Sequence, residues 1–231
     1  MTSSLPALPV GILDYLTLAF CLACWVGYTL YSERSSTRRP NMMAAMSLRR
    51  RQWMAQMAGR DLRMVDTNIL GMTVQAISMF ASTSIIIVGG LLAVLGALDE
   101  ARAVARSLAF VRQAPIQVWE VRILVLAGVF TYAFFKFAWS IRQYNQVAIL
   151  IGACPPASAE DPDGIAEQAA AVGTLAALSY NRGIRAYYFG LAIPTSFIHP
   201  LLLVAATLWV VNILHRREFR SRTLKAVLGK G

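Results

Sequence analysis

The residues best suited to chemistry are cations and amides that stand among aromatic side chains. Lys136 lies in the otherwise apolar run 132–139, and Arg142, Gln143 and Asn145 follow shortly after it. A charge at membrane depth costs about 2.5 kcal/mol or more, so it needs a partner, a wet cavity or a route to the interface. Two arrangements would keep Lys136 charged. In the first, its ammonium group reaches the cytoplasmic interface. In the second, aromatic faces and a carboxylate on another helix hold the ammonium group within the bundle.

A second group of the same kind occurs near the C-terminal third. Asn181, Arg182 and Arg185 run into the aromatic stretch 187–189, and His199 stands further on between two prolines. Prolines free backbone carbonyl groups, which at membrane depth must be satisfied by neighbours, water or an ion. We expect both groups to lie at the inner ends of the last helices. There they would form either a buried network that holds the fold or a path selective for anions.

One long apolar stretch carries a ladder of polar and small residues at roughly helical spacing: Gln75, Ser78, Ser82 and Gly89. Small residues let helix backbones approach closely, and hydroxyl and amide groups bond across helices. The ladder therefore predicts a helix-packing surface or, as the alternative, the lining of a pore.

Catalytic and metal-binding patterns are scarce in this sequence. It contains no phosphate-binding glycine loop, no G-x-S-x-G and no H-E-x-x-H. Cys21 and Cys24 share a helix face and could, with His199, bind a soft metal. Two small residues buried in a membrane helix are the simpler interpretation. We expect no catalytic residue, no metal site and no cofactor.

The elements that position these residues follow from composition. Of 231 residues, 57% are apolar and only 15% are charged, and several apolar runs reach the length of about 20 residues that crosses a bilayer. The fold class is all-α, a polytopic transmembrane bundle of about four spans that forms one membrane domain, residues 1–231. The expected spans are residues 10–31, 68–98, 119–139 and 186–214, with cytoplasmic amphipathic helical segments at about 43–65 and 165–181. Asp163 is the expected N-cap of the last of these segments.

The net charge of +10 fits a membrane partner better than nucleic acid. The cations flank apolar runs, as expected for contact with anionic headgroups and for the positive-inside bias, and no nucleic-acid-binding motif accompanies them. The basic segment 33–66 should therefore be cytoplasmic, which places the N-terminus outside. Four spans would then leave the basic tail 216–230 outside as well, against the charge rule. Either the rule fails there, or the region 172–214 makes more than one plain crossing.

Several blocks of the sequence resemble one known family. The runs 25–28, 134–143, 150–153 and 181–189 are similar to a bacterial membrane family known as domain of unknown function 599. The resemblance covers most of the chain and implies an uncharacterised protein of the bacterial inner (cytoplasmic) membrane. The apolar runs make it multi-pass, and the charge rule places its N-terminus in the periplasm. It implies no activity.

Two functional hypotheses follow. The first is a pore- or transporter-type component for a small solute, such as an anion, which works as an oligomer. The alternative is a non-catalytic accessory or scaffold subunit of a membrane protein complex. The partners expected are anionic headgroups of the bilayer and either further copies of the chain or a membrane-complex partner.

Overall fold

The computed structural model describes residues 11–35, 41–108, 111–159, 161 and 163–229. Within these residues the chain forms α-helices and no strand, which confirms the all-α prediction. The helices, in chain order, are α1 (Ile12–Ser35), α2 (Met42–Ala58), α3 (Met64–Gly96), α4 (Leu98–Arg106), α5 (Ile116–Ala153), α6 (Ile165–Ala192), α7 (Thr195–Ile198), α8 (Pro200–Phe219) and α9 (Arg222–Val227).

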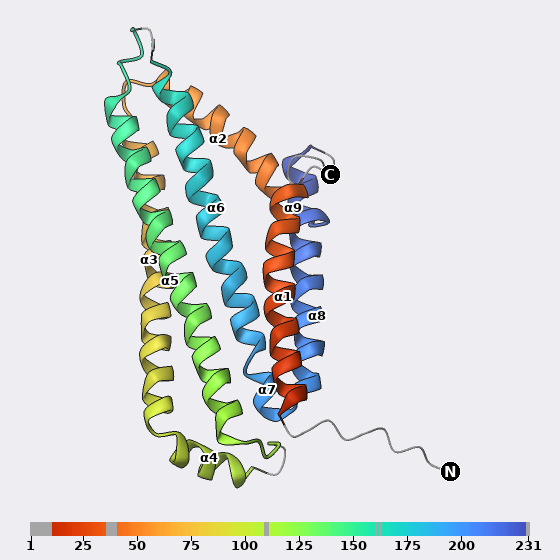
Figure 1. The fold of residues 1–231 in the computed structure, drawn as a ribbon. Coiled ribbons are helices and arrows are strands. Elements are labelled where there is room, and N and C mark those ends of the chain that lie inside the picture. The colour runs from red at the N-terminus through yellow and green to blue at the C-terminus, as the bar shows by residue number, and fades with distance from the viewer. Residues whose placement is uncertain (1–10, 36–40, 109–110, 160, 162, 230–231) are drawn as a thin grey trace.

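Five long helices, α1, α3, α5, α6 and α8, lie side by side (Figure 1). Helices α1, α5 and α8 run in one direction, and α3 and α6 run in the other. Helices α2 and α9 lie toward one end of this bundle, together with the C-terminal ends of α1 and α8, and we call it the basic end. Helices α4 and α7 lie at the opposite end, called the α4 end.

Three of the described helices, α1, α3 and α5, are long and apolar enough to cross a membrane. Helix α5 is central, and 44% of its most apolar window is buried, against 17% for α3. Helix α3 therefore lies at the outside of the bundle and exposes large apolar side chains such as Met72, Met79 and Ile86 along its length. Such an apolar surface is typical of a membrane-associated protein.

The helix ends have local causes in the sequence. Asn41 caps α2 by accepting a hydrogen bond from Ala44 N at 2.8 Å, and α2 stops at Gly59. Helix α5 ends just before Pro155, and the guanidinium group of Arg63 donates to the carbonyl oxygens of Ile151, Cys154 and Pro155. A cation at carbonyl groups that lack helical partners stabilises a helix C-terminus.

The start of α6 corrects one prediction. The carboxylate of Asp161, not that of Asp163, accepts hydrogen bonds from Ile165 N and Ala166 N at 3.0 and 3.1 Å. Gly164 makes the turn possible because its φ of +62° lies in the left-handed region. These backbone hydrogen bonds lower the pKa of Asp161.

The predicted segments 165–181 and 186–214 are not two helices as expected. Helix α6 continues unbroken to Ala192, and the interruption comes at Pro194, after which α8 begins at Pro200. The chain thus runs down the bundle in α6 and returns in α8. The basic tail therefore lies at the same end as α2, and the conflict between the tail's charge and a single last span disappears.

Two other boundaries also differ. The predicted segment 43–65 ends as helix α2 at Ala58, and the predicted span 119–139 continues as α5 to Ala153. The extra length of α5 packs against α6, where Val147 and Ile151 are buried beside Ala169 and Ala170.

The contact between α5 and α6 depends on one glycine. Phe137 is fully buried, and a Cβ atom on Gly183 would lie only 2.6 Å from its ring. Gly183 therefore lets α6 approach α5 closely, and Tyr180 and Tyr187 pack around the same phenylalanine.

Candidate functional site

An ion-pair network joins three helices at the basic end. We call it the Glu33–Glu218 network, and its members are Tyr28, Ser32 and Glu33 of α1, Arg182 and Arg185 of α6, and Glu218 of α8. Arg182 donates to both carboxylate oxygens of Glu33 at 2.7 Å each. This two-pronged geometry is the strongest that an arginine and a carboxylate form.

Arg185 is the buried centre of this network, with 5% of its surface exposed. Its Nε donates to Glu218 Oε1 at 2.9 Å, and its Nη2 donates to Ser32 Oγ at 2.7 Å. Its Nη1 lies 3.8 Å from Glu33 Oε1. Tyr28 and Ser32 donate their hydroxyl protons to the other oxygen of Glu218. Both guanidinium groups are therefore matched by carboxylates.

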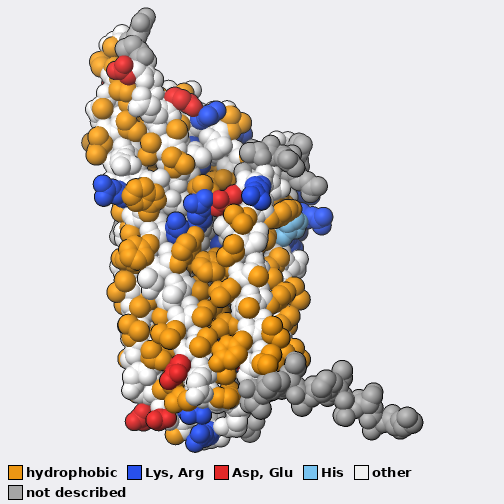
Figure 2. Space-filling model, in the orientation of Figure 1, with side chains coloured by type: hydrophobic (Ala, Val, Ile, Leu, Met, Phe, Trp, Pro, Cys, Tyr) orange, Lys and Arg blue, Asp and Glu red, His pale blue; other side chains and the backbone are white. Residues whose placement is uncertain are grey.

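Lys136 borders the network from α5. Its ammonium nitrogen lies 5.2 Å from the centre of the Tyr132 ring, and it interacts favourably with the charge of Glu33. An aromatic face and a carboxylate on another helix thus both lie near this ammonium group. Lys136 comes 20 residues after Ile116, the first residue of α5, or about 30 Å along the helix, which is about the thickness of the hydrocarbon core. Figure 2 shows lysine and arginine side chains gathered in a band above a hydrophobic belt.

The other predicted residues of this group are placed nearby but do not join the network. Gln143 is buried and accepts a hydrogen bond from Ser179 Oγ at 2.8 Å. Arg142 is exposed, 6.0 Å from the Trp139 ring, and Asn145 is exposed too. Asn181 faces the sulfur of Met43 at 3.8 Å. The structure therefore brings Lys136, Arg182 and Arg185 together and leaves the other predicted residues as separate contacts.

His199 lies at the other end of the molecule. It stands between α7 and α8, where its Nδ1 accepts a hydrogen bond from Leu201 N at 3.2 Å and caps α8. At the same end Arg122 of α5 and Asp14 of α1 form a buried ion pair, and the Phe197 ring lies 5.3 Å from the guanidinium group. This buried pair locks α1 to α5 at the α4 end.

The predicted ladder on α3 points away from the bundle. Gln75, Ser82 and Gly89 are exposed, and Ser78 is half-buried with its hydroxyl bonded to Val74 O at 2.9 Å. The face of α3 that packs in the bundle carries Ile77, Ala81 and Ser84 instead. Within the described chain three of the four ladder residues thus lie on the exposed side of α3.

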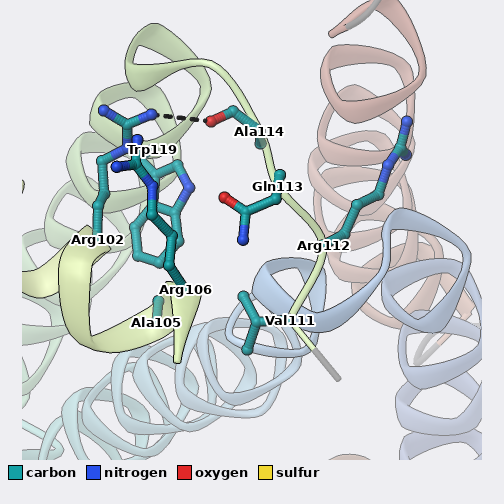
Figure 3. A pocket seen from close by; sticks show the side chains of 8 residues that line it. All are labelled: Arg102, Ala105, Arg106, Val111, Arg112, Gln113, Ala114 and Trp119. Carbon is teal, nitrogen blue, oxygen red and sulfur yellow. Dashed lines mark hydrogen bonds between the residues drawn. The ribbon is translucent and has the colours of Figure 1, made fainter. Parts of the chain in front are cut away.

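A crevice at the α4 end is too small for a ligand. It lies between α4 and residues 111–114, and Arg102 there donates to Ala114 O at 3.2 Å (Figure 3). Its volume of about 10 Å³ is no more than one water molecule needs.

The larger cavity, about 380 Å³, lies at the basic end between α2, α3, α5 and α6. We call it the notch. Cations and aromatic rings line it together with apolar and small residues: Met46, Arg49, Arg50, Trp53, Met54, Leu70, Thr73, Tyr144, Val147, Ala169, Ala170 and Gly173. The sequence pattern does not single out this site, because its walls come from four separate segments.

Arg50 is the distinctive residue of the notch. Its only hydrogen bond to a described residue is a long one, 3.4 Å, to Thr174 Oγ1, and it forms no ion pair with any described carboxylate. Burial lowers its pKa. Arg51, the next residue, pairs with Glu167 at 3.1 Å. Within the part of the chain that the structure describes, a partly buried guanidinium group thus lies in a cavity without a carboxylate partner.

Sequence patterns identify Glu33 as a possible partner for the cations, but not Glu218. Glu218 stands within a basic tail, and only the return of α8 along α1 brings it to Arg185. As for metals, no three histidine, cysteine, aspartate or glutamate residues among those described lie close enough together to hold an ion.

Comparison with known proteins gives one match. A family model described as "Protein of unknown function, DUF599" matches residues 16–223. No curated protein and no solved structure matches the chain.

Proposed function

The chain belongs to the DUF599 family of proteins of unknown function, and from this starting point we propose that it is a pore- or transporter-type membrane component that takes up a small anionic solute at its basic end and works as an oligomer. The observation that carries this proposal is the notch, where Arg50 has no carboxylate partner among the described residues. Cavities of about 300–1,000 Å³ that combine apolar walls with a few polar groups are the usual form of a binding site.

The notch supports an anionic solute better than the Glu33–Glu218 network does. In the network, Arg182 and Arg185 are already matched by Glu33 and Glu218. Arg49, which also lines the notch, donates to two neutral acceptors among the described residues, Gln52 Oε1 at 2.8 Å and Val227 O at 3.1 Å. An anion would therefore meet uncompensated positive charge in the notch and balanced charge in the network.

The placement of cations supports an orientation in the membrane. The segments 33–66 and 216–230 carry 12 of the 19 arginines. Helices α2 and α9, which belong to these segments, lie at the same end of the bundle (Figure 1). The positive-inside rule favours a cytoplasmic position for that end. The N-terminus is then periplasmic in a bacterial inner membrane, and the notch opens on the cytoplasmic side.

A liposome experiment with two neighbouring arginines tests the proposal. The purified chain is reconstituted, and binding and flux of anions are measured for Arg50→Gln and for the matched control Arg51→Gln. Hydrogen bonds to a charged group contribute about 1.5–3 kcal/mol, so Arg50→Gln should weaken binding about ten- to hundredfold. Arg51→Gln should change it by less than about threefold, since exposed ion pairs contribute little.

Two results would contradict the proposal. One is the absence of any anion binding or flux at varied pH and voltage. The other is an equal effect of the two substitutions, because the exposed Arg51 lies outside the notch.

The outer face of α3 favours a second candidate, a non-catalytic accessory or scaffold subunit of a membrane complex. Gln75 is exposed on an apolar helix and forms no hydrogen bond with any described residue. An amide at membrane depth is stabilised when a helix of another chain supplies its hydrogen bonds. Native purification should then recover a stoichiometric partner, and Gln75→Leu should release it. Recovery of a homo-oligomer alone would favour the first candidate.

A further inference from the structure

The notch lies beside the junction of α2 and α3. Helices α2 and α3 are joined beside Asp66, which accepts hydrogen bonds from Arg60 Nη1 at 2.8 Å and from Trp53 Nε1 at 2.7 Å. From this junction α2 crosses toward α1 while α3 follows α5 down the bundle (Figure 1). The notch lies in the angle between them, and α5 and α6 form its floor.

One part of the notch is suited to an anionic group. Arg49 and Arg50 stand next to each other on α2, and neither forms an ion pair with a described carboxylate. The planar guanidinium group matches the oxygens of a phosphate or carboxylate in a two-pronged way. The Cδ atom of Arg50 lies 3.9 Å from the Cβ position of Gly173, so its stem rests on α6 and its orientation is restricted.

The rest of the notch is suited to hydrocarbon. Met54, Leu70 and Val147 are buried in one apolar cluster, and the small residues Ala170 and Gly173 leave room beside them. A small inorganic anion would not cover this surface. Each methylene group placed there should increase affinity about fourfold.

The surroundings of the notch indicate how such a ligand enters. Leu48 on α2 and Ile69 and Met72 on α3 are exposed, Met72 to 65%. Leu70 and Thr73, which line the notch, belong to α3, and α3 is apolar enough to cross the membrane. An apolar rim beside a membrane-crossing helix faces lipid better than it faces water.

We propose that the notch binds an acidic single-chain amphiphile, with its phosphate or carboxylate head at Arg49 and Arg50 and its acyl chain between α2 and α3. This rests on the proposed function, since it names the class of anion that the chain takes up. The volume of about 380 Å³ suits one chain and a small head. Tyr144 and Val147, which line the notch, lie 8 and 11 residues beyond Lys136 along α5, so the ligand enters from the lipid–water interface at the basic end.

Saturation binding to the purified full-length chain in nanodiscs of zwitterionic lipid tests this. The probes are dodecyl phosphate, dodecylphosphocholine, which has the same chain but no net charge, and inorganic phosphate. Dodecyl phosphate should bind at least about tenfold more tightly than dodecylphosphocholine and at least about a hundredfold more tightly than inorganic phosphate, which corresponds to burial of three or four methylene groups. Arg50→Gln should remove the preference over dodecylphosphocholine, and Arg51→Gln should retain it.

A pair of threonines on α3 provides a test of position. Thr73 lines the notch and Thr83 is exposed on the same helix, and each bonds its hydroxyl to the carbonyl four residues earlier, at 2.9 and 2.8 Å. Thr73→Trp should fill the notch and weaken dodecyl phosphate binding at least about tenfold, while Thr83→Trp should leave it unchanged. Thermal unfolding of both variants shows whether each one is folded.

The outcomes separate this inference from the proposed function. If inorganic phosphate binds as tightly as dodecyl phosphate and the binding depends on Arg50, the anion site stands and the amphiphile is wrong. If both dodecyl compounds bind equally, the cations do not select the ligand and the inference is overturned. If no probe binds in a manner that depends on Arg50, both proposals fail. Equal effects of the two tryptophan substitutions on dodecyl phosphate binding would show that the ligand does not lie in the notch.

Discussion

Replacing Glu218 with glutamine tests whether the Glu33–Glu218 network is a structural lock. The substitution keeps the shape of the side chain but removes the charge that faces Arg185 at 2.8 Å. Arg185 is buried and would keep only the hydroxyl of Ser32 and the more distant Glu33, at 3.8 Å. Leaving a buried charge without its partner costs about 3–5 kcal/mol. Because glutamine still offers a hydrogen-bond acceptor, we expect a loss near about 3 kcal/mol.

An exposed ion pair in the same chain provides the control. Arg51 and Glu167 lie 3.1 Å apart, but their side chains are 63% and 61% exposed. Glu167→Gln should therefore cost no more than about 1 kcal/mol. The free energy of unfolding is measured by denaturant titration in detergent micelles for both variants and for the double variant of Glu218→Gln with Arg185→Met. In the double variant most of the loss should be recovered, because no unpaired charge remains.

One result would refute this reasoning. If Glu218→Gln costs no more than Glu167→Gln, the network contributes little to stability. Arg185 would then tolerate the loss of its carboxylate, as a cation that serves to bind an anion does. The hypothesis of an anion path along these residues would gain support from that result.

Two further predictions concern the α5–α6 hairpin. Gly183→Ala should destabilise the protein by about 1–3 kcal/mol in thermal unfolding, because the new Cβ would lie 2.6 Å from the Phe137 ring. The control Gly128→Ala, with nothing within 4 Å of its Cβ, should be neutral or stabilising. Equal effects of the two substitutions would show that Phe137 moves aside freely. The carboxylate of Asp161 has a lowered pKa because it accepts backbone hydrogen bonds at the start of α6. Its contribution to stability is therefore present at neutral pH and is lost as the pH falls through that lowered value, and Asp161→Asn should flatten the acid side of a stability–pH profile; an unchanged profile would contradict this.

The sequence predicts the helical class and the grouping of cations because both depend on local composition. Long apolar runs specify α1, α3 and α5, and Lys136, Arg182 and Arg185 stand near the ends of apolar stretches. The end of α5 is harder to predict, since the mostly polar stretch 140–146 separates the long apolar run from the last turns, residues 147–153. This stretch packs in the bundle through tertiary contacts such as the hydrogen bond between Gln143 and Ser179.

Helix α6 shows how tertiary packing overrides a local signal. Gly183, between two arginines, indicates the start of a new segment in the sequence. In the structure it lies inside the continuous helix α6, where the Phe137 ring fills the space beside it. Helix α2 is a similar case. Its methionines are compatible with a helix that lies on lipid, but Met54 and Met57 are buried within the chain.

The notch depends on these same long-range contacts. Arg49, Arg50 and Arg51 are indistinguishable in the sequence, and only the fold shows that one pairs with Glu167 while the other two border a cavity. A site whose walls come from four segments has no local pattern that identifies it.

The two ionic locks of α1 have a mechanical consequence. Asp14 pairs with Arg122 near one end of this helix, and Glu33 pairs with Arg182 near the other. The two acids are 19 residues apart, about 28 Å along the helix, so the distance between the locks is close to the hydrocarbon thickness of about 30 Å. Each ion pair is costly to move among the acyl chains, so the two pairs together should fix the depth of the bundle in the membrane. A thicker bilayer would pull against both ends at once, so we expect the stability of the bundle to fall as the membrane thickens.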